Sequence, residues 1–251
     1  MPRSPKNPQD EAQKPSTRSA SQVARDNIVK ALMALAAEKP WAEISISDIA
    51  QRGGVSLADF RDLFPSKGAI LAAYSKGIDA KVLAADSKDL ADEPAKERLF
   101  DVLMRRLDAM APHRAGLQGV MAWARRDPLA LAALNQVALN SMRFMLEAAG
   151  IDSEGALGSL KLQGLVLAWT KVLDVWFEDD DAGLAATMAA LDKQLTRGGQ
   201  FVARAEDAQR LLAPLHHFAQ ALFDTQRNFG SRMRQRWSAP GSGTEDSGAG
   251  I

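Results

Sequence analysis

Residues 44–74 constrain the fold of this chain more than any other stretch. Ser45 stands three residues before Asp48, and this spacing is the pattern of a capping box, in which a hydroxyl and a carboxylate bond free backbone N–H groups at a helix start. A helix is therefore expected to begin at Ile46. The pair at 53–54 consists of two glycines, whose permissive backbone allows a sharp turn. The stretch thus begins with a short helix that ends in a tight turn.

The residues after that turn predict a second short helix. Ser56 is followed three residues later by Asp59, which repeats the capping pattern. Apolar residues recur at intervals of three and four and would form the buried face: Leu57, Phe60, Leu63 and Phe64. Two short helices joined by a glycine turn are the pattern of a helix-turn-helix, and the second of them would be the recognition helix.

The remaining apolar periodicity predicts an all-α fold, with a three-helix head joined to a C-terminal helical bundle. Further helices are expected over 21–39, 67–87, 97–110, 114–126, 129–149, 153–177, 184–195 and 205–237. The expected organisation is a disordered arm at 1–20, a helix-turn-helix head at 21–87, a ligand-binding and dimerisation domain at 88–237, and a disordered tail at 238–251.

The composition of the chain limits the classes of function that it can have. Basic and acidic residues are balanced at 31 each, so attraction to a polyanion would have to come from a local patch. The chain has no cysteine, which excludes disulfides and cysteine nucleophiles and is compatible with a cytoplasmic location. Common hydrolase, nucleotide-binding and metalloprotease motifs are missing, and the histidines at 113, 216 and 217 lack the spacing of a metal site. We therefore expect neither enzyme activity nor a metal or cofactor.

Several residues of the head match a known family in identity and spacing. They are Ser45, Asp48-Ile49-Ala50, Gly54-Val55-Ser56, Phe60, Phe64-Pro65-Ser66-Lys67 and Ala69-Ile70-Leu71. On these residues the stretch 25–75 resembles the tetracycline-repressor-like (TetR) transcriptional regulators. The resemblance implies a head that binds double-stranded DNA, an all-helical body, a homodimer and a small hydrophobic ligand.

Under this resemblance, six residues are expected at the DNA surface: Ser45, Ser56, Leu57, Ala58, Arg61 and Lys67. Arg61 stands where the family commonly carries a tyrosine, and a guanidinium is a good ligand for phosphate or guanine. Asp62 opposes binding to a polyanion. Residues 21–81 carry eight basic and seven acidic side chains, so the overall attraction of the head to phosphates is weak.

The body contains aromatic residues and methionines at helical spacing. Six of them are expected to line a hydrophobic ligand cavity: Met121, Trp123, Phe144, Met145, Trp169 and Trp176. An ordinary bundle core explains the same pattern equally well. The acidic run at 178–181 could hold a hard cation, but it lacks the spacing of a calcium loop, and we expect it to cap the next helix.

The segment 176–198 is similar to a second family, the lipid-binding proteins that assist ubiquinone biosynthesis and have a TetR-like fold without DNA binding. This likeness implies a membrane-touching helix near the C-terminus, and the stretch 226–237 is basic and amphipathic. Its candidate membrane residues are Phe229, Arg232, Met233, Arg236 and Trp237. A dimer helix with a basic exposed side explains the same stretch. A DNA-binding regulator and a lipid-binding accessory protein with a vestigial helix-turn-helix are therefore both open.

Overall fold

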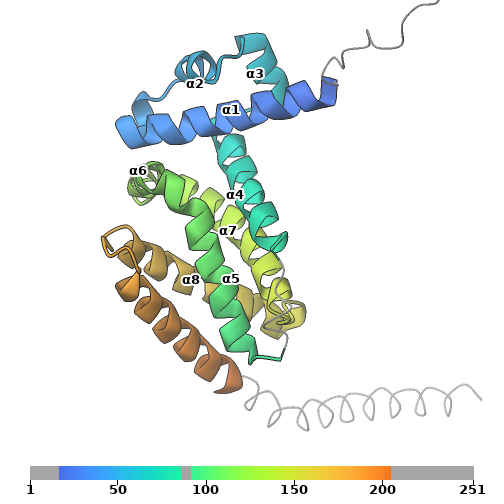
Figure 1. The fold of residues 1–251 in the computed structure, drawn as a ribbon, viewed down its shortest axis with the longest axis vertical. Helices are drawn as coiled ribbons and strands as arrows, with labels where there is room; N and C mark the ends of the chain where they lie inside the picture. Colours follow the sequence, from blue (N-terminus) through green and yellow to red (C-terminus); the bar gives the residue numbers. More distant parts are fainter. Residues whose placement is uncertain (1–16, 86–91, 205–251) are drawn as a thin grey trace, which may run out of the picture. The chain divides into compact units, whose positions relative to one another are not determined.

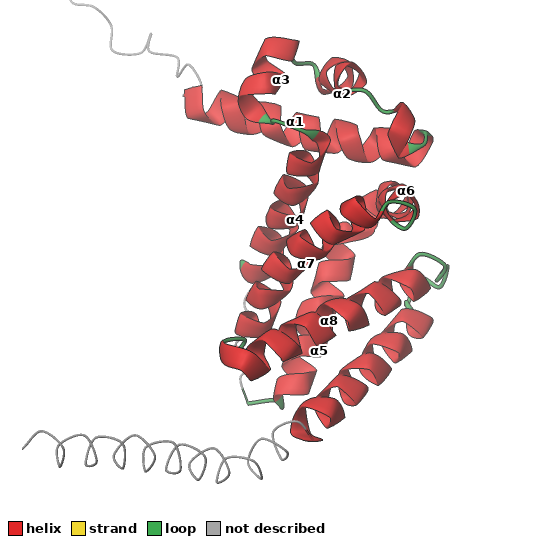
Figure 2. Cartoon of the chain, turned by 180° about the vertical axis from the view of Figure 1, so that it is seen from behind, coloured by secondary structure: helices red, strands yellow, loops and turns green. Residues whose placement is uncertain are grey.

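The computed structural model describes residues 17–85 and 92–204, and every regular element in these ranges is a helix (Figure 1). Figure 2 shows the same helices from behind, with loops between them and no strand in the described ranges. The described residues up to Gln200 form one compact unit, and Phe201 begins a second. The expected all-α fold is confirmed.

Three helices and one short 3-10 turn make up the head. They are α1 (Thr17–Glu38), η1 (Trp41–Glu43), α2 (Ile46–Gly53) and α3 (Leu57–Leu63). α2 and α3 lie along one side of α1, and α4 (Lys67–Leu83) crosses beneath them (Figure 1). Side chains of α1, α2 and α3, together with one from the start of α4, fill the core of the head: Ile28, Leu32, Ile49, Phe60 and Ile70.

Local hydrogen bonds hold the helix-turn-helix as its sequence predicts. The Ser45 hydroxyl accepts from the backbone N–H of Asp48 at 3.0 Å, and the Asp48 carboxylate accepts from the Ser45 N–H at 3.0 Å. Gly54 ends α2 in the left-handed region, with φ at 66°, where a glycine is favoured. Ser56 accepts from the N–H of Asp59 at 3.1 Å and donates its own proton to that carboxylate at 2.6 Å. Both predicted caps are confirmed.

The body packs around the far part of α4. Its elements are α5 (Ala95–Met110), η3 (Ala111–His113), α6 (Arg114–Ala124), α7 (Pro128–Ala148) and α8 (Gly155–Trp176), followed by helical residues 185–204. α4 lies beside both α5 and α7, and α7 also lies beside α8. The bounds of α5 to α8 agree with the predicted helices to within two residues at each end.

Three predicted bounds are wrong. The helix expected over 67–87 ends at Leu83, four residues earlier than predicted. α1 begins at Thr17, inside the stretch 1–20 that was expected to be an arm. The helix expected over 184–195 continues to 204, the last described residue before the C-terminal gap. The rest of the arm, the helix expected over 205–237 and the tail at 238–251 lie outside the described residues.

The acidic run after α8 caps the next helix, as expected. Asp181 accepts from the backbone N–H of Ala185 at 3.1 Å. Asp179 differs from the expected solvated carboxylate because it is buried, and it accepts from the N–H and the hydroxyl of Thr187 at 2.8 and 2.6 Å. These bonds from Thr187 lower the pKa of Asp179. In the part of the chain that the structure describes, no group of acidic, histidine or cysteine side chains is arranged to hold a metal ion.

Candidate DNA-binding surface and ligand cavity

Five of the six residues expected at the DNA surface are exposed: Ser45, Ser56, Leu57, Ala58 and Arg61. They lie at the start of α2 and along α3, which the caps orient. Leu57 is an apolar side chain with 56% of its surface exposed. Arg61 forms no hydrogen bond or ion pair with any residue in the described ranges, so its guanidinium is available to an outside partner.

Other basic side chains of the head already have partners within the chain. Arg52 donates to the Glu38 carboxylate at 2.6 Å, and this bond lowers the pKa of Glu38. Lys39 donates to Asp48 at 2.7 Å and, as the largest cause, lowers the pKa of that carboxyl to about 2. These pairs neutralise charge on the α1 and α2 side of the head. The free positive charge of α3 is therefore concentrated in Arg61.

Lys67 corrects the sixth prediction. Its ammonium donates to the backbone carbonyls of Trp41 and Ile44 at 3.0 and 2.8 Å, and it lies over the Trp41 ring, 4.7 Å from the ring centroid. Partial burial lowers its pKa. Lys67 thus ties the start of α4 to the loop before α2. It does not extend outward from the head, because these two loop carbonyls lie within its reach.

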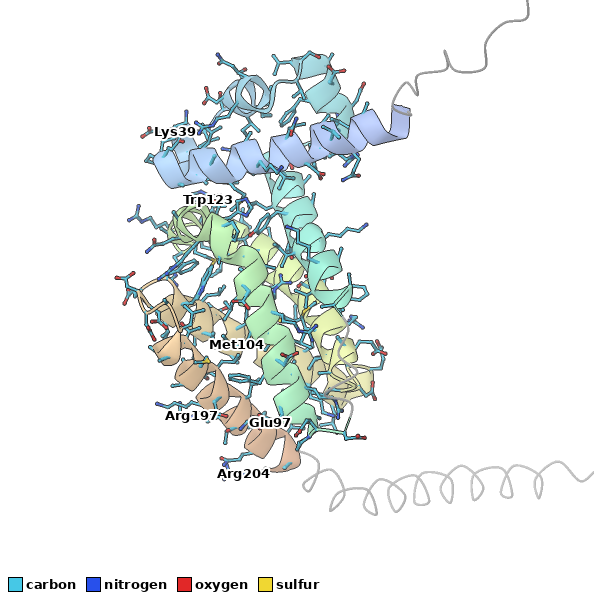
Figure 3. All side chains as sticks on the ribbon, in the orientation of Figure 1. Lys39, Glu97, Met104, Trp123, Arg197 and Arg204 are labelled. Carbon is cyan, nitrogen blue, oxygen red and sulfur yellow. The ribbon has the colours of Figure 1, made fainter. Side chains whose placement is uncertain are left out.

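The head and the body are in close contact where η1 and α1 meet α6. Trp41 of η1 stacks on Trp123 of α6, with ring centroids 4.8 Å apart and an angle of 24° between the ring planes. Figure 3 shows Trp123 on the side of α6 that faces α1. A Cβ atom placed on Gly116 of α6 would lie 2.3 Å from the carbonyl oxygen of Met33 in α1, so only a glycine allows the two backbones to approach this closely. Sequence reasoning did not pair Trp41 with Trp123, which lies about eighty residues later in the chain.

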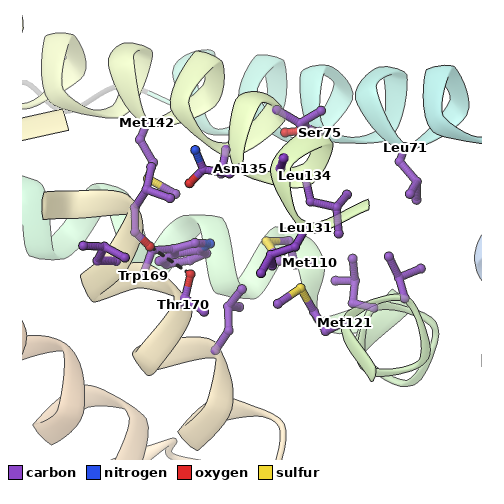
Figure 4. Close-up of a pocket in the computed structure, with 18 of the residues that line it drawn as sticks. Leu71, Ser75, Met110, Met121, Leu131, Leu134, Asn135, Met142, Trp169 and Thr170 are labelled. Carbon is purple, nitrogen blue, oxygen red and sulfur yellow. Dashed lines mark hydrogen bonds between the residues drawn. The ribbon is translucent and has the colours of Figure 1, made fainter. Parts of the chain in front are cut away.

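The body encloses a cavity of about 580 Å³ between α4, α5, α6, α7 and α8. Figure 4 shows Ser75 from α4, Leu134 and Asn135 from α7, and Trp169 and Thr170 from α8 around it. Its size is within the range of small-molecule sites, and its wall is mostly apolar. The sequence left a ligand cavity and an ordinary bundle core equally open, and the structure contains a cavity in the body.

Only two of the six residues expected to line this cavity do so, namely Met121 and Trp169. The other four have different surroundings. Trp123 stacks on Trp41, Phe144 is 53% exposed, and Met145 and Trp176 are buried in the closed part of the core. Trp123 instead lines a smaller cavity at the junction with the head. The predictions for Phe144, Met145 and Trp176 are wrong because helical spacing identifies an apolar face without showing whether that face meets a void, a neighbouring helix or solvent.

A buried polar cluster in the cavity wall was missed. Arg106 of α5, 5% exposed, forms an ion pair with Asp79 of α4 and donates to the Ser75 hydroxyl at 3.2 Å. Ser141 of α7 donates to the same Asp79 carboxylate at 2.7 Å. The cluster joins three helices through one carboxylate. In the sequence, this cluster is indicated by Arg106 and Asp79, two charged residues that lie on the apolar faces of their helices.

The residues expected to touch a membrane lie outside the described ranges, so the lipid-binding alternative is untested at Phe229, Arg232, Met233, Arg236 and Trp237. In residues 17–85 and 92–204, no helix is both long and apolar enough to cross a bilayer. The likeness to the ubiquinone-pathway family stays a prediction from sequence.

Comparisons with known proteins agree on the fold. Neither the protein-family models nor the curated proteins contain a match to this chain. Among solved structures, a TetR transcriptional regulator from Nitrosomonas europaea ATCC 19718 is 26% identical, with a TM-score of 0.52 over 70% of this chain and 98% of that one. A TetR transcriptional regulator from Rhodococcus sp. RHA1 is 20% identical, with a TM-score of 0.51 over 71% of this chain and 97% of that one.

Proposed function

We propose that this chain, which has the fold of the TetR transcriptional regulators, is itself a regulator that binds double-stranded DNA in the cytoplasm and responds to a small hydrophobic ligand. The observation that carries the proposal is the exposed α3, where Arg61 has no partner among the described residues, while Lys39, Arg52 and Lys67 are bonded within the chain. Ser56, Leu57 and Ala58 lie at the start of the same helix.

Arg61 would supply the main contact to a phosphate or to a guanine edge. The hydroxyl of Ser45 and that of Ser56 stand at helix starts, close to where backbone N–H groups favour an anion. Asp62 is exposed on the same helix and repels phosphates. The proposed binding therefore depends on the fit of α3 to one DNA sequence more than on general charge attraction.

A homodimer is part of the proposal because two recognition helices would read two half-sites. Leu160 and Leu167 are 40% and 58% exposed on α8, seven residues apart and so on one face of the helix. Gly164 lies between them, and no atom comes within 4 Å of where its Cβ would be. An exposed strip of two leucines and a glycine is suited to close helix packing against a second copy.

The cavity supports the proposed ligand response. α4 contributes Leu71, Tyr74 and Ser75 to the cavity wall, and Lys67, one to two turns earlier at the start of the same helix, is bonded to the loop before α2. A ligand that shifts α4 would therefore move the head. In a dimer this movement would change the distance between the two recognition helices.

The test is selection of binding sites from random double-stranded DNA with the full chain, followed by affinity measurements at low and moderate salt. A preferred sequence is expected to emerge. Arg61→Ala should weaken binding to it about tenfold or more, because a charged contact to a base or phosphate is lost. Lys193→Ala is the matched control, since this exposed lysine lies on the helical segment 185–204 of the body.

Asp62→Asn should strengthen binding, because it removes a negative charge from the proposed surface. Leu160→Glu should abolish the dimer in analytical ultracentrifugation, and DNA affinity should fall with it. If selection yields no preferred sequence, or if Arg61→Ala binds as tightly as the parent chain, the proposed function is wrong.

A further inference from the structure

We infer that the body cavity binds an uncharged amphiphile, with its polar group at Asn135 and Gln163 and its apolar tail directed toward Trp41 and Trp123 at the junction with the head. This inference names the ligand class of the proposed regulator and rests on that function for its biological use. The binding itself is measured without DNA.

The charge balance of the wall excludes an ionic ligand. Arg106 is the only charged side chain that lines the cavity within the described residues, and its charge is neutralised by Asp79. An anion would have to compete with the Asp79 carboxylate, which is itself held by Ser141. A cation would meet no free carboxylate. A charged ligand would lose its hydration without gaining a partner, which is unfavourable in an apolar site.

One pair of polar side chains in the wall is incompletely bonded. Gln163 of α8 donates to the side-chain oxygen of Asn135 of α7 over 3.4 Å, and the structure gives no further partner to the Asn135 amide nitrogen or the Gln163 oxygen. This leaves one donor and one acceptor, which together suit a hydroxyl group. Thr170, by contrast, already donates to the carbonyl of Val166 at 3.0 Å.

Tyr74 also lines the cavity, and its hydroxyl lacks a partner among the described residues. Its oxygen has almost no accessible surface, so a ligand in the cavity does not reach it. Burial raises the pKa of Tyr74 to about 12, and the hydroxyl stays neutral at physiological pH. Tyr74 therefore adds neither charge nor a contact to the site.

A second, smaller cavity of about 280 Å³ lies at the junction of head and body. Its wall includes Trp41, Trp123 and one charged side chain, Lys67. The Lys67 ammonium already donates to the carbonyls of Trp41 and Ile44, so it is not left unpaired for an anionic ligand. Leu71, Leu134 and Val137 line this cavity and the larger one, so only apolar side chains stand between the two spaces. An apolar tail that displaces them would pass from the body cavity to the stacked tryptophans. A bound tail of this kind would join the two cavities into one elongated site.

The first experiment compares ligands of equal length by calorimetry on the full chain at pH 7.5. Dodecanol, dodecanoate and dodecylammonium are titrated below the concentrations at which they aggregate. We expect dodecanol to bind at least about tenfold more tightly than either ion, since neither charge finds a partner in the wall. Equal or tighter binding of dodecanoate or dodecylammonium overturns the inference.

The second experiment tests the polar end of the site. Asn135→Leu and Gln163→Leu should each weaken dodecanol binding about threefold to tenfold, as expected for loss of one hydrogen bond. Both variants should bind dodecane at least as well as the parent chain. Gln136→Leu is the matched control, because Gln136 is exposed on α7 and bonds Asn140 outside the cavity. If Gln136→Leu has the same effect as Asn135→Leu, the assignment of the polar end is wrong.

The third experiment tests the tail. The chain contains five tryptophans, and labelling with 5-fluorotryptophan gives each a fluorine resonance, assigned by single Trp→Phe variants. Hexanol should shift the resonance of Trp169 alone, whereas dodecanol should also shift those of Trp41 and Trp123. Saturating dodecanol that leaves Trp123 unmoved overturns the elongated site. If no DNA sequence is selected but these shifts appear, the proposed function fails and the ligand inference stands.

Discussion

The head and the body of this molecule are both helical, but different contacts hold them together. In the head (residues 17–64), the long α1 packs against two short helices, α2 and α3, whose starts are capped by Ser45 and Ser56. Phe60 and its neighbours fill the core of the head. The body (residues 67–200) consists of long helices around a cavity, with a buried ion pair between Asp79 and Arg106. The head presents a defined outer surface, while the body leaves room inside for a ligand.

The largest expected effect lies in the body. Asp79→Ala leaves the Arg106 guanidinium buried without its counter-charge, and it should lower the free energy of unfolding by about 3–5 kcal/mol. Urea denaturation monitored by circular dichroism measures the loss. The double variant Asp79→Ala/Arg106→Met should recover much of it, since no buried charge remains. A loss below about 1 kcal/mol in the single variant would show that the pair is solvated.

The junction between the two regions should show an intermediate effect. Gly116→Ala places a Cβ atom against the Met33 carbonyl of α1, and overpacking of this kind costs about 1–3 kcal/mol. The stacked Trp41 and Trp123 should separate, which a change in tryptophan fluorescence would report. Gly198→Ala is the control, because its Cβ would meet no atom within 4 Å. Unchanged fluorescence in Gly116→Ala would mean that α6 moves without opening the stack.

The smallest expected effect tests the turn of the head. Gly54→Ala should cost about 1–2 kcal/mol, because a residue with a Cβ atom is strained at a φ of 66°. Gly77→Ala in α4 should instead stabilise the chain by up to about 1 kcal/mol, since alanine is the better helix former. Both positions have open space around the added atom, so the comparison isolates the backbone. Thermal unfolding of both variants measures the difference, and equal shifts would contradict it.

Sequence reasoning predicted the caps of the head correctly because these hydrogen bonds join residues that are close together in the sequence. The bonds of Ser45 with Asp48 and of Ser56 with Asp59 join residues three apart, so their spacing alone predicts them. Five of the six residues expected at the DNA surface are exposed for the same reason. Lys67 was placed wrongly, since its partners Trp41 and Ile44 lie more than twenty residues earlier in the chain.

The body was predicted less well. Its helices follow from apolar periodicity, and the bounds of α5 to α8 agree closely with those expected. The lining of the cavity depends on how those helices rotate against one another, which periodicity does not specify. Met121 and Trp169 were identified, whereas Asn135 and Gln163, which carry the inferred polar end, were not.

The sequence by itself determined the helical class, the caps, the glycine turn and the exposed α3, because each depends on neighbours within one or two turns of chain. Only the tertiary structure decided that Lys67 closes a loop, that Trp41 stacks on Trp123, and that the body contains a cavity with one neutralised charge. Those features require atoms from separate helices to meet. These contacts depend on how the helices pack. Many packing arrangements are compatible with the same apolar pattern, and they differ in which side chains are in contact.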